Sequence, residues 1–383
     1  MLGLISVKPA EVKESFVFFH QLPVFSNIFR RHSTKSAEYQ WEVPNNNIER
    51  FPIHSTASLY RDQNHGSTNT PNAGQHPGGL GLWLGCLFTK RNHKRIFMHS
   101  IYRSATAKAS FLALYQEKLE SLDIPFELRL VETSFGSTNI ILVGREKAPP
   151  MVLIHAWNAC APMALEDFSA LSKDFSVYAI DVPGQPNLSA EDRPNIHGAA
   201  YGEWLYEIIS FLNLQQVYLV GVSFGAFIGW KGILHDARRI RKAFFINPMG
   251  IVGPNIWQRF WQIQAPVYLY KYWPSPQLNR WYLQGMYTTP NTFAKRWAFH
   301  LLTRYNWNLK SIPAVSSAQA QLVHTPIYVV GSSLDALAPG QWTLTKSKDI
   351  FPSFAGGLVL KNGKHFPNTA GYREIVAFIK QHQ

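Results

Sequence analysis

The stretch QVYLVGVSFGAFIGWKGIL, residues 216–234, joins two apolar runs through a serine. The first run, 216–223, is rich in β-branched and aromatic residues and predicts a buried strand, and the second predicts a helix over 225–240. At the junction, Gly221, Ser223 and Gly225 form the pattern G-x-S-x-G. A strand that turns sharply into a helix through this pattern holds the serine hydroxyl above the sheet, at a helix N-terminus. We therefore expect a nucleophile at Ser223.

Short apolar runs recur on both sides of this junction, and helical patterns lie between most of them. The predicted strands are 126–135 and 138–144, which form a hairpin, and 151–157, 175–182, 242–248, 326–332 and 357–362. The other predicted helices are 104–122, 162–173, 199–213, 341–350 and 371–382. Strands that alternate with helices favour a mostly parallel sheet covered on both faces. Ligands of such sheets bind at the carboxyl ends of the strands, so the chemistry is expected there.

Two polar residues follow strands that are predicted downstream of Ser223. Asp335 lies just beyond 326–332, and His365 lies beyond 357–362. A nucleophilic serine needs a base, and the base needs an acid that orients it. The order Ser, Asp, His, each at the end of a strand, predicts a catalytic triad of Ser223, Asp335 and His365. The alternatives are that Asp335 only forms a turn and that His365 is a surface loop residue.

These motifs resemble the α/β-hydrolase superfamily, of the serine esterase, lipase and haloperoxidase-like kind, over residues 125–383. The loop AIDVPGQPNLS, residues 179–189, is similar to the D-x-P-G-x-G-x-S loop of that family. The matching residues are Asp181, Pro183, Gly184 and Ser189. The second glycine is missing, and the loop is one residue longer. The resemblance implies an α/β-hydrolase fold, with a mostly parallel eight-stranded sheet flanked by helices and a helical cap inserted after strand 6. It implies no cofactor and no metal.

The segment LIHAWNACAP, residues 153–162, resembles the loop after the third strand of the family, which usually reads H-G-x. The resemblance places the backbone N–H groups of an oxyanion hole at Trp157 and Phe224. Such donors are typically worth about 3 kcal/mol each in acyl transfer. Ala156 stands where relatives usually have glycine, so we expect its methyl group to restrict the loop and narrow the oxyanion pocket. His155 has no partner at metal-ligand spacing, which favours a structural histidine over a metal ligand.

Differences in composition predict the domain organisation. Residues 1–97 show no sustained pattern, and 61–80 are dense in Asn, Gly, Pro, Gln and Ser. We expect 1–97 to be a disordered or non-native N-terminal extension, with a regulatory or membrane-attracted tail as the alternative. Residues 98–249 and 321–383 form the predicted α/β-hydrolase core, and residues 250–320 form the predicted helical cap.

The predicted cap is aromatic and basic. No Asp or Glu occurs from Ala237 to Leu334, whereas the same span contains basic residues such as Lys271 and Arg280. In one interpretation the aromatic side chains pack inside the cap and the basic ones face solvent. In the other, they form a surface that contacts an anionic membrane, or line a pocket for a negatively charged acyl group. A nucleic-acid partner is not expected, because no recognised nucleic-acid module is present.

Charge and cysteine content limit the class of protein further. The chain has 383 residues, a net charge of +13 and two cysteines, Cys86 and Cys160. Two cysteines are too few for a disulfide scaffold or a cysteine zinc cluster. No secretory signal and no apolar run of membrane-spanning length is apparent. We therefore expect a cytoplasmic protein, with peripheral membrane contact as a further hypothesis.

The expected function is that of a serine hydrolase. Its substrate would be a small-molecule carboxylic ester with an apolar acyl group, cleaved through an acyl-enzyme as in carboxylesterases and lipases. One alternative is a carbon–carbon bond hydrolase with the same triad, and another is a non-catalytic binding protein on a hydrolase scaffold. Epoxide and haloalkane hydrolysis are disfavoured, because those relatives carry aspartate at the position of Ser223.

Overall fold

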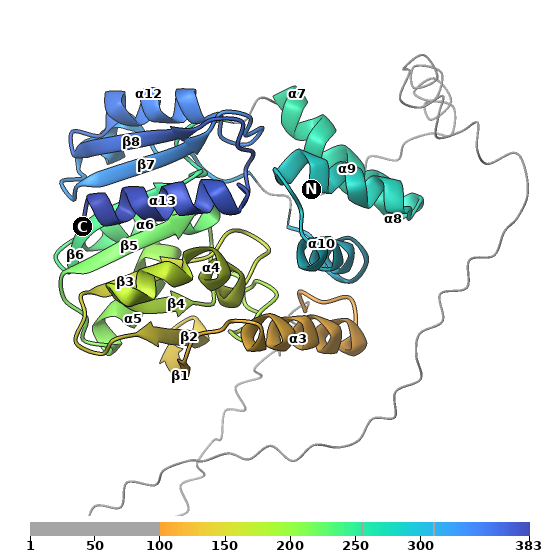
Figure 1. Cartoon of the computed structure of the whole chain (residues 1–383), viewed down its shortest axis with the longest axis horizontal. Helices are drawn as coiled ribbons and strands as arrows, with labels where there is room; N and C mark the ends of the chain where they lie inside the picture. Colours follow the sequence, from red (N-terminus) through yellow and green to blue (C-terminus); the bar gives the residue numbers. More distant parts are fainter. Residues whose placement is uncertain (1–99, 254–255, 309–310) are drawn as a thin grey trace, which may run out of the picture. The chain divides into compact units, whose positions relative to one another are not determined.

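A computed structural model describes residues 100–253, 256–308 and 311–383 of the chain, so the expectation for 1–97 lies outside the described residues. The strands are β1 (Phe126–Thr133), β2 (Gly136–Gly144), β3 (Pro150–Ile154), β4 (Ser176–Ile180), β5 (Val217–Val222), β6 (Ile240–Ile246), β7 (Ile327–Ser332) and β8 (Phe354–Leu360). They form one eight-stranded sheet in the order β1-β2-β4-β3-β5-β6-β7-β8 (Figure 1). The pairs β1–β2 and β2–β4 are antiparallel, and every later pair is parallel.

Helices cover both faces of this sheet. On one face lie α4 (Ala161–Phe168) and α13 (Thr369–Gln381), with α3 (Ala105–Glu120) extending the same apolar core. On the other face lie α5 (Ala200–Phe211), α6 (Phe224–His235) and α12 (Gly340–Ile350). Side chains alternate along a strand, so Leu153 of β3 packs on the first face and Val152 on the second. The mostly parallel eight-stranded sheet flanked by helices is confirmed.

Several predicted boundaries differ from the structure; for example, β8 begins at Phe354 rather than at 357. The helix expected over 162–173 ends as the 3₁₀ segment η1 (Ser169–Lys173). The helix expected over 225–240 ends earlier, at His235, and β6 begins at Ile240 rather than at 242. The cause is local, because the Asp236 carboxylate accepts the backbone N–H of Arg238 at 2.9 Å, which gives the backbone an alternative to the helix.

A helical segment connects β6 to β7. It contains α7 (Ile256–Arg259), the π-helical turn η2 (Phe260–Gln264), α8 (Ala265–Tyr272), α9 (Pro276–Met286), α10 (Thr292–Arg304) and α11 (Ser317–Gln321). We call the helices from α7 to α10 the cap helices. They lie beside the sheet in Figure 1 and share a small apolar core that includes Tyr270, Tyr282 and Leu302. The boundaries 250–320 stay a prediction. Among the described residues, no helix has both the length and the apolar character needed to cross a membrane.

Aromatic packing joins α10 to α3. The ring of Phe111 on α3 is fully buried and meets Trp297 edge-on, with ring centroids 5.2 Å apart. Tyr305 contacts the same ring at 6.2 Å, and its backbone pairs with that of Tyr102 in an isolated antiparallel bridge. The cap helices therefore rest on α3 through one aromatic cluster.

Replacement of Phe111 by alanine tests the packing of α10 on α3. We expect Phe111→Ala to lower the free energy of unfolding by about 3–5 kcal/mol, because a fully buried ring is lost and a cavity remains. Urea denaturation followed by circular dichroism measures the change. The control Leu322→Ala removes a side chain that is 71% exposed, and should change stability by less than about 0.5 kcal/mol. Equal effects of the two substitutions would contradict this account of the packing.

Candidate active site

The turn between β5 and α6 holds Ser223 in an unusual backbone conformation. Its φ is 55° and its ψ is −107°, values that non-glycine residues rarely adopt. The flanking glycines leave the room that this turn needs. A Cβ at Gly225 would lie 2.2 Å from the carbonyl oxygen of Ile154, and one at Gly221 would lie 2.5 Å from the carbonyl oxygen of Gly225. The first turn of α6 can therefore pack directly on the end of β3.

The three residues of the predicted triad lie together. His365 Nε2 is 2.8 Å from Ser223 Oγ, and His365 Nδ1 is 2.8 Å from Asp335 Oδ2. Each of the three residues is only 2% exposed. With the proton on Nδ1, the imidazole donates to the carboxylate, and Nε2 is left to accept the serine hydroxyl. This arrangement can remove a proton from Ser223, which is what a serine nucleophile requires.

Backbone contacts fix the acid and the base of this group. The other carboxylate oxygen of Asp335 accepts the N–H groups of Leu337 at 2.8 Å and Ala338 at 3.2 Å. The carbonyl of His365 accepts the side-chain amide of Asn247 at 2.7 Å. Asn247 has a φ of 44° and follows the carboxyl end of β6. The strand predicted over 242–248 includes Asn247, so a contact of this residue beyond the end of β6 was not expected from the sequence.

The predicted oxyanion donors lie beside the serine. The indole of Trp157 stacks on the ring of Phe224, with centroids 4.9 Å apart and planes at 28°. In the described part of the chain, neither backbone N–H donates to a protein acceptor: the N–H of Phe224 begins a helix, and that of Trp157 lies in a turn. Both groups are thus available as donors to a ligand.

His155 is placed as a structural residue. It is buried, its Nδ1–H donates to the Ala156 carbonyl at 2.8 Å, and its Nε2 accepts the N–H of Val182 at 2.9 Å. Burial lowers the pKa of His155 to about 4, so its imidazole is neutral near pH 7. Among the described residues, Ala156 is not one of those with a positive φ, and the strained residue of this loop is Asn158, with a φ of 58°. Ala156 is therefore not in a backbone conformation that favours glycine, and the expected narrowing of the oxyanion pocket by its methyl group stays a prediction.

Two side chains from distant elements hold Asn158. Its N–H donates to Gln185 Oε1 at 2.8 Å, and its carbonyl accepts the indole N–H of Trp297 at 2.8 Å. Gln185 stands at an unspecified position of the family pattern, directly before the place where the second glycine is missing, so the pattern did not point to it. Trp297 comes from α10, and no pattern in the sequence pointed to this contact. Together they fix the loop that carries Trp157.

Comparison with known proteins identifies the family. A sequence profile described as the Alpha/beta hydrolase family matches residues 151–378, which is more than half of the chain. The chain belongs to the α/β-hydrolase family. Carboxylesterase YbfK of Bacillus subtilis (strain 168) is 30% identical over 138 residues, which are 36% of this α/β hydrolase and 47% of YbfK. Uncharacterized carboxylesterase nap of the same organism is 26% identical over 134 residues, which are 35% of this chain and 45% of nap.

This α/β hydrolase thus spans less than half the length of either curated relative. Among solved structures, naproxen esterase (carboxylesterase NP) from Bacillus subtilis superposes with a TM-score of 0.63. That match covers 73% of this chain and 99% of the esterase at 17% sequence identity. A likeness at this level of identity shows a shared fold.

A pocket of about 390 Å³ opens beside the serine of this α/β hydrolase. Its lining includes Ala156 of the loop that carries Trp157, and Val222 and Phe366, the chain neighbours of Ser223 and His365. Residues of α4, α10 and α13 complete the lining. A pocket of this size can hold a small molecule.

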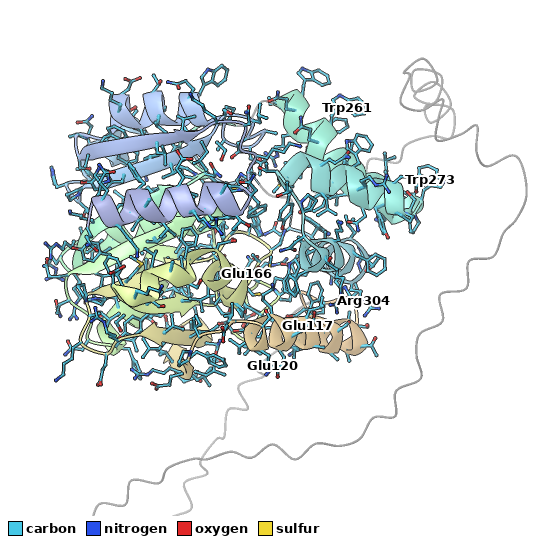
Figure 2. All side chains as sticks on the ribbon, viewed as in Figure 1. Glu117, Glu120, Glu166, Trp261, Trp273 and Arg304 are labelled. Atoms are coloured by element: carbon cyan, nitrogen blue, oxygen red, sulfur yellow. The ribbon has the colours of Figure 1, made fainter. Side chains whose placement is uncertain are left out.

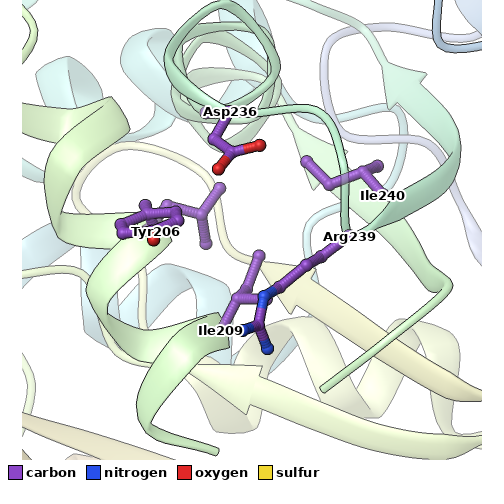
Figure 3. A pocket seen from close by; sticks show the side chains of 7 residues that line it. Tyr206, Ile209, Asp236, Arg239 and Ile240 are labelled. Carbon is purple, nitrogen blue, oxygen red and sulfur yellow. The ribbon is translucent and has the colours of Figure 1, made fainter. Parts of the chain in front are cut away.

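The hollow in Figure 3, between Tyr206, Asp236 and Arg239, is only about 10 Å³ and is too small for a substrate. Within the described residues, no three His, Cys, Asp or Glu side chains gather as metal ligands.

A methyl group at position 225 tests the contact between α6 and β3. We expect Gly225→Ala to displace the first turn of α6, because its Cβ would lie 2.2 Å from a backbone oxygen that cannot rotate away. Thermal unfolding should show a loss of roughly 2–4 kcal/mol. In the control Gly198→Ala, the nearest atom to the added Cβ is 3.9 Å away, and stability should stay near that of the wild type. An unchanged melting temperature in Gly225→Ala would refute the close approach.

Proposed function

We propose that this protein is a serine hydrolase that cleaves a carboxylic ester through an acyl-enzyme intermediate. The observation that carries the proposal is the pair of 2.8 Å contacts that link Ser223, His365 and Asp335 at the carboxyl ends of the strands. Relatives named carboxylesterases support an ester as the substrate, of the kind cleaved by carboxylesterases and lipases. Among hydrolases of this fold, the ester-cleaving reaction is therefore favoured over carbon–carbon bond cleavage.

In the first step, Ser223 Oγ attacks the ester carbonyl while its proton passes to His365 Nε2. The carbonyl oxygen becomes negative and accepts the N–H groups of Trp157 and Phe224. Collapse of this intermediate breaks the bond to the alcohol oxygen, which takes the proton from His365. Asp335 stabilises the imidazolium throughout. The products of this half-reaction are the free alcohol and an acyl group on Ser223.

In the second step, water replaces the alcohol. His365 removes a proton from the water molecule, whose oxygen attacks the acyl carbonyl, and the same two N–H groups hold the oxyanion. The bond to Ser223 then breaks, and the proton returns to Ser223 Oγ while the carboxylic acid leaves. The reaction consumes one water and uses only side chains and backbone groups of the chain.

The cap helices complete this site. Phe366 N–H donates to the carbonyl of Met286, at the end of α9, at 2.9 Å, so a cap helix contacts the loop that carries His365. Phe293 of α10 and Met163 of α4 line the pocket beside the serine. Apolar side chains of this kind can hold an apolar part of the acyl group away from water. The proposed role of 250–320 is that of a cap over the active site.

Labelling with a fluorophosphonate probe tests the enzymatic proposal. We expect the wild type to be labelled and Ser223→Ala to lose both labelling and esterase activity, the latter by about 10³-fold or more. Asp335→Asn should lower kcat by about 10⁴-fold, because the imidazole loses its orientation. The control Ser317→Ala changes an exposed serine of α11 and should behave as the wild type. Folded wild-type protein that takes up no probe would speak against catalysis and for a binding protein.

We also propose that the cap helices contact anionic membranes peripherally. Their aromatic side chains divide into two sets. Tyr270 and Tyr282 pack inside the cap, whereas Tyr272 is 67% and Trp273 is 58% exposed. Figure 2 shows Trp273 at the end of α8, pointing away from the sheet. Aromatic residues beside basic ones, in a segment without acidic residues, suit a negatively charged lipid surface.

Vesicle co-sedimentation tests this contact. We expect more binding to phosphatidylcholine vesicles that contain phosphatidylserine than to phosphatidylcholine alone, and less binding at high salt. Trp273→Ala should weaken binding by several-fold, because the buried apolar area falls. The matched control Trp342→Ala removes a tryptophan that is 65% exposed on α12, and should leave binding unchanged. Equal binding to both kinds of vesicle would exclude recognition of anionic lipid.

A further inference from the structure

The pocket beside Ser223 has an acidic and aromatic lining, although the chain as a whole is basic. Its acidic residues are Glu166 and Asp167, both from α4. Its aromatic residues are Tyr287, Phe293, Phe366 and Tyr372. Among the described residues that line it, none is Lys or Arg. The lining therefore does not favour the hypothesis of a pocket for a negatively charged acyl group.

The two carboxylates differ in their partners. Glu166 pairs with Lys118 of α3 at 2.8 Å. Asp167 is partly buried and interacts with the Tyr372 hydroxyl of α13, and no described Lys, Arg or His forms an ion pair with it. A carboxyl group in a pocket without a cationic partner is unfavourable in its charged form. A cation from solution should therefore bind more favourably at Asp167 than at Glu166, which is already paired with Lys118.

Burial raises the pKa of Asp167 to about 8. The nearby charge of Glu166 acts in the same direction, whereas the Tyr372 hydroxyl and Lys118 lower this pKa. Tyr287 also lies near Asp167, and burial raises its own pKa far above the physiological range. His155 lines the same pocket, and burial lowers its pKa to about 4, so it stays neutral as Asp167 ionises. Asp167 is consequently uncharged at low pH and gains its negative charge as the pH rises through about 8.

Aromatic rings add a second attraction for a cation. Ammonium groups bind over aromatic faces, and cages of aromatic and acidic side chains recognise quaternary ammonium ligands. The Lys118 ammonium lies 4.2 Å from the ring centroid of Phe293, so the rings left for a ligand are those of Tyr287, Phe366 and Tyr372. Tyr287 and Phe366 stack on each other at 4.7 Å in the wall of the pocket. The combination of one unpaired acid with several rings suits an ammonium group better than a neutral alkyl chain.

We propose that this pocket binds a positively charged ammonium group on the acyl part of the ester, with Asp167 as its counter-ion. The acyl part is indicated because the pocket is lined by His155 and Ala156 of the oxyanion loop, where the carbonyl of the acyl group lies during the reaction. The inference rests on the proposed ester hydrolysis and deepens it by naming the substrate class. It makes Asp167 a specificity-determining residue.

Matched esters test the proposal on the full-length chain. The probes are p-nitrophenyl esters of a trimethylammonio-alkanoic acid and of its tert-butyl isostere of equal length. The ammonium group carries a permanent charge, and protonation of the triad affects both esters alike. In the wild type we expect the ratio of kcat/KM for the cationic ester to that for the isostere to rise about tenfold from about pH 6 to about pH 9, as Asp167 ionises.

Substitutions assign the effect to one side chain. In Asp167→Asn the ratio should stay constant with pH, whereas the matched control Asp349→Asn, on the exposed face of α12, should follow the wild type. In Tyr372→Phe the rise should move to higher pH, because the hydroxyl that lowers the pKa of Asp167 is gone. Tyr372→Phe keeps the aromatic ring, so it tests the role of Asp167 even if Asp167→Asn does not fold.

Each result separates this inference from the proposed function. If the wild type hydrolyses the isostere but its ratio does not change with pH, the ammonium site is wrong and ester hydrolysis stands. A rise that persists in Asp167→Asn would also overturn the assignment. If neither ester is cleaved and the fluorophosphonate probe does not label Ser223, the proposed function itself fails, and the ammonium site with it.

Discussion

The geometry of the candidate site depends on Gly225, because a side chain at this position would prevent α6 from approaching β3. The first turn of α6 approaches the end of β3 so closely that a Cβ at Gly225 would lie 2.2 Å from the carbonyl oxygen of Ile154. Because β3 and β5 are neighbouring parallel strands, this contact brings the loop after β3 beside the turn after β5. Trp157 and Phe224 stack there, and Ser223 is held between strand and helix at a φ of 55°. The backbone itself therefore sets the position of Ser223, the proposed nucleophile.

Much of this arrangement could be predicted from the sequence, for two physical reasons. Buried parallel strands are short continuous apolar runs, so β3 to β7 were recognisable one by one. Parallel strands also align their carboxyl ends, so residues just after strands, such as Ser223, Asp335 and His365, were expected to lie close together. The end of α6 was missed because the turn made by Asp236 and Arg238 depends on a side-chain contact rather than on hydrophobic periodicity.

Local sequence patterns could not predict the hydrogen bonds that hold Asn158 in the loop that carries Trp157. Asn158 and Trp297 are 139 positions apart, and their hydrogen bond exists only because α10 packs on α3. Gln185 is 27 positions from Asn158 and lies in a loop whose departure from the family pattern was visible. What that departure does depends on the conformation of two loops, which no spacing rule describes. Sequence patterns predicted the triad residues, and the folded chain shows which contacts hold the loop beside them.

The net charge of the chain and the charge of the pocket lining differ in sign. The net charge of +13 and the basic cap segment pointed toward anionic partners. A net charge is a property of the whole surface and acts at a distance, whereas a pocket is governed by the few groups that line it. Here those groups come from the last turn of α4 and the first turns of α10 and α13, which contribute Asp167, Phe293 and Tyr372. A basic net charge and an acidic pocket lining thus occur in the same chain.

The aromatic cluster around Phe111 fixes α10 relative to the loop that carries Trp157. Trp297 buries its ring against Phe111 and uses its indole N–H to hold the carbonyl of Asn158. A movement of α10 away from α3 would expose these rings to water and break that hydrogen bond at the same time. The first change costs apolar burial and the second leaves the carbonyl of a strained residue without its donor. The cap helices and the loop that carries Trp157 are consequently stabilised as one unit, and the same contact between Trp297 and Asn158 links the pocket wall formed by α10 to the proposed oxyanion donors.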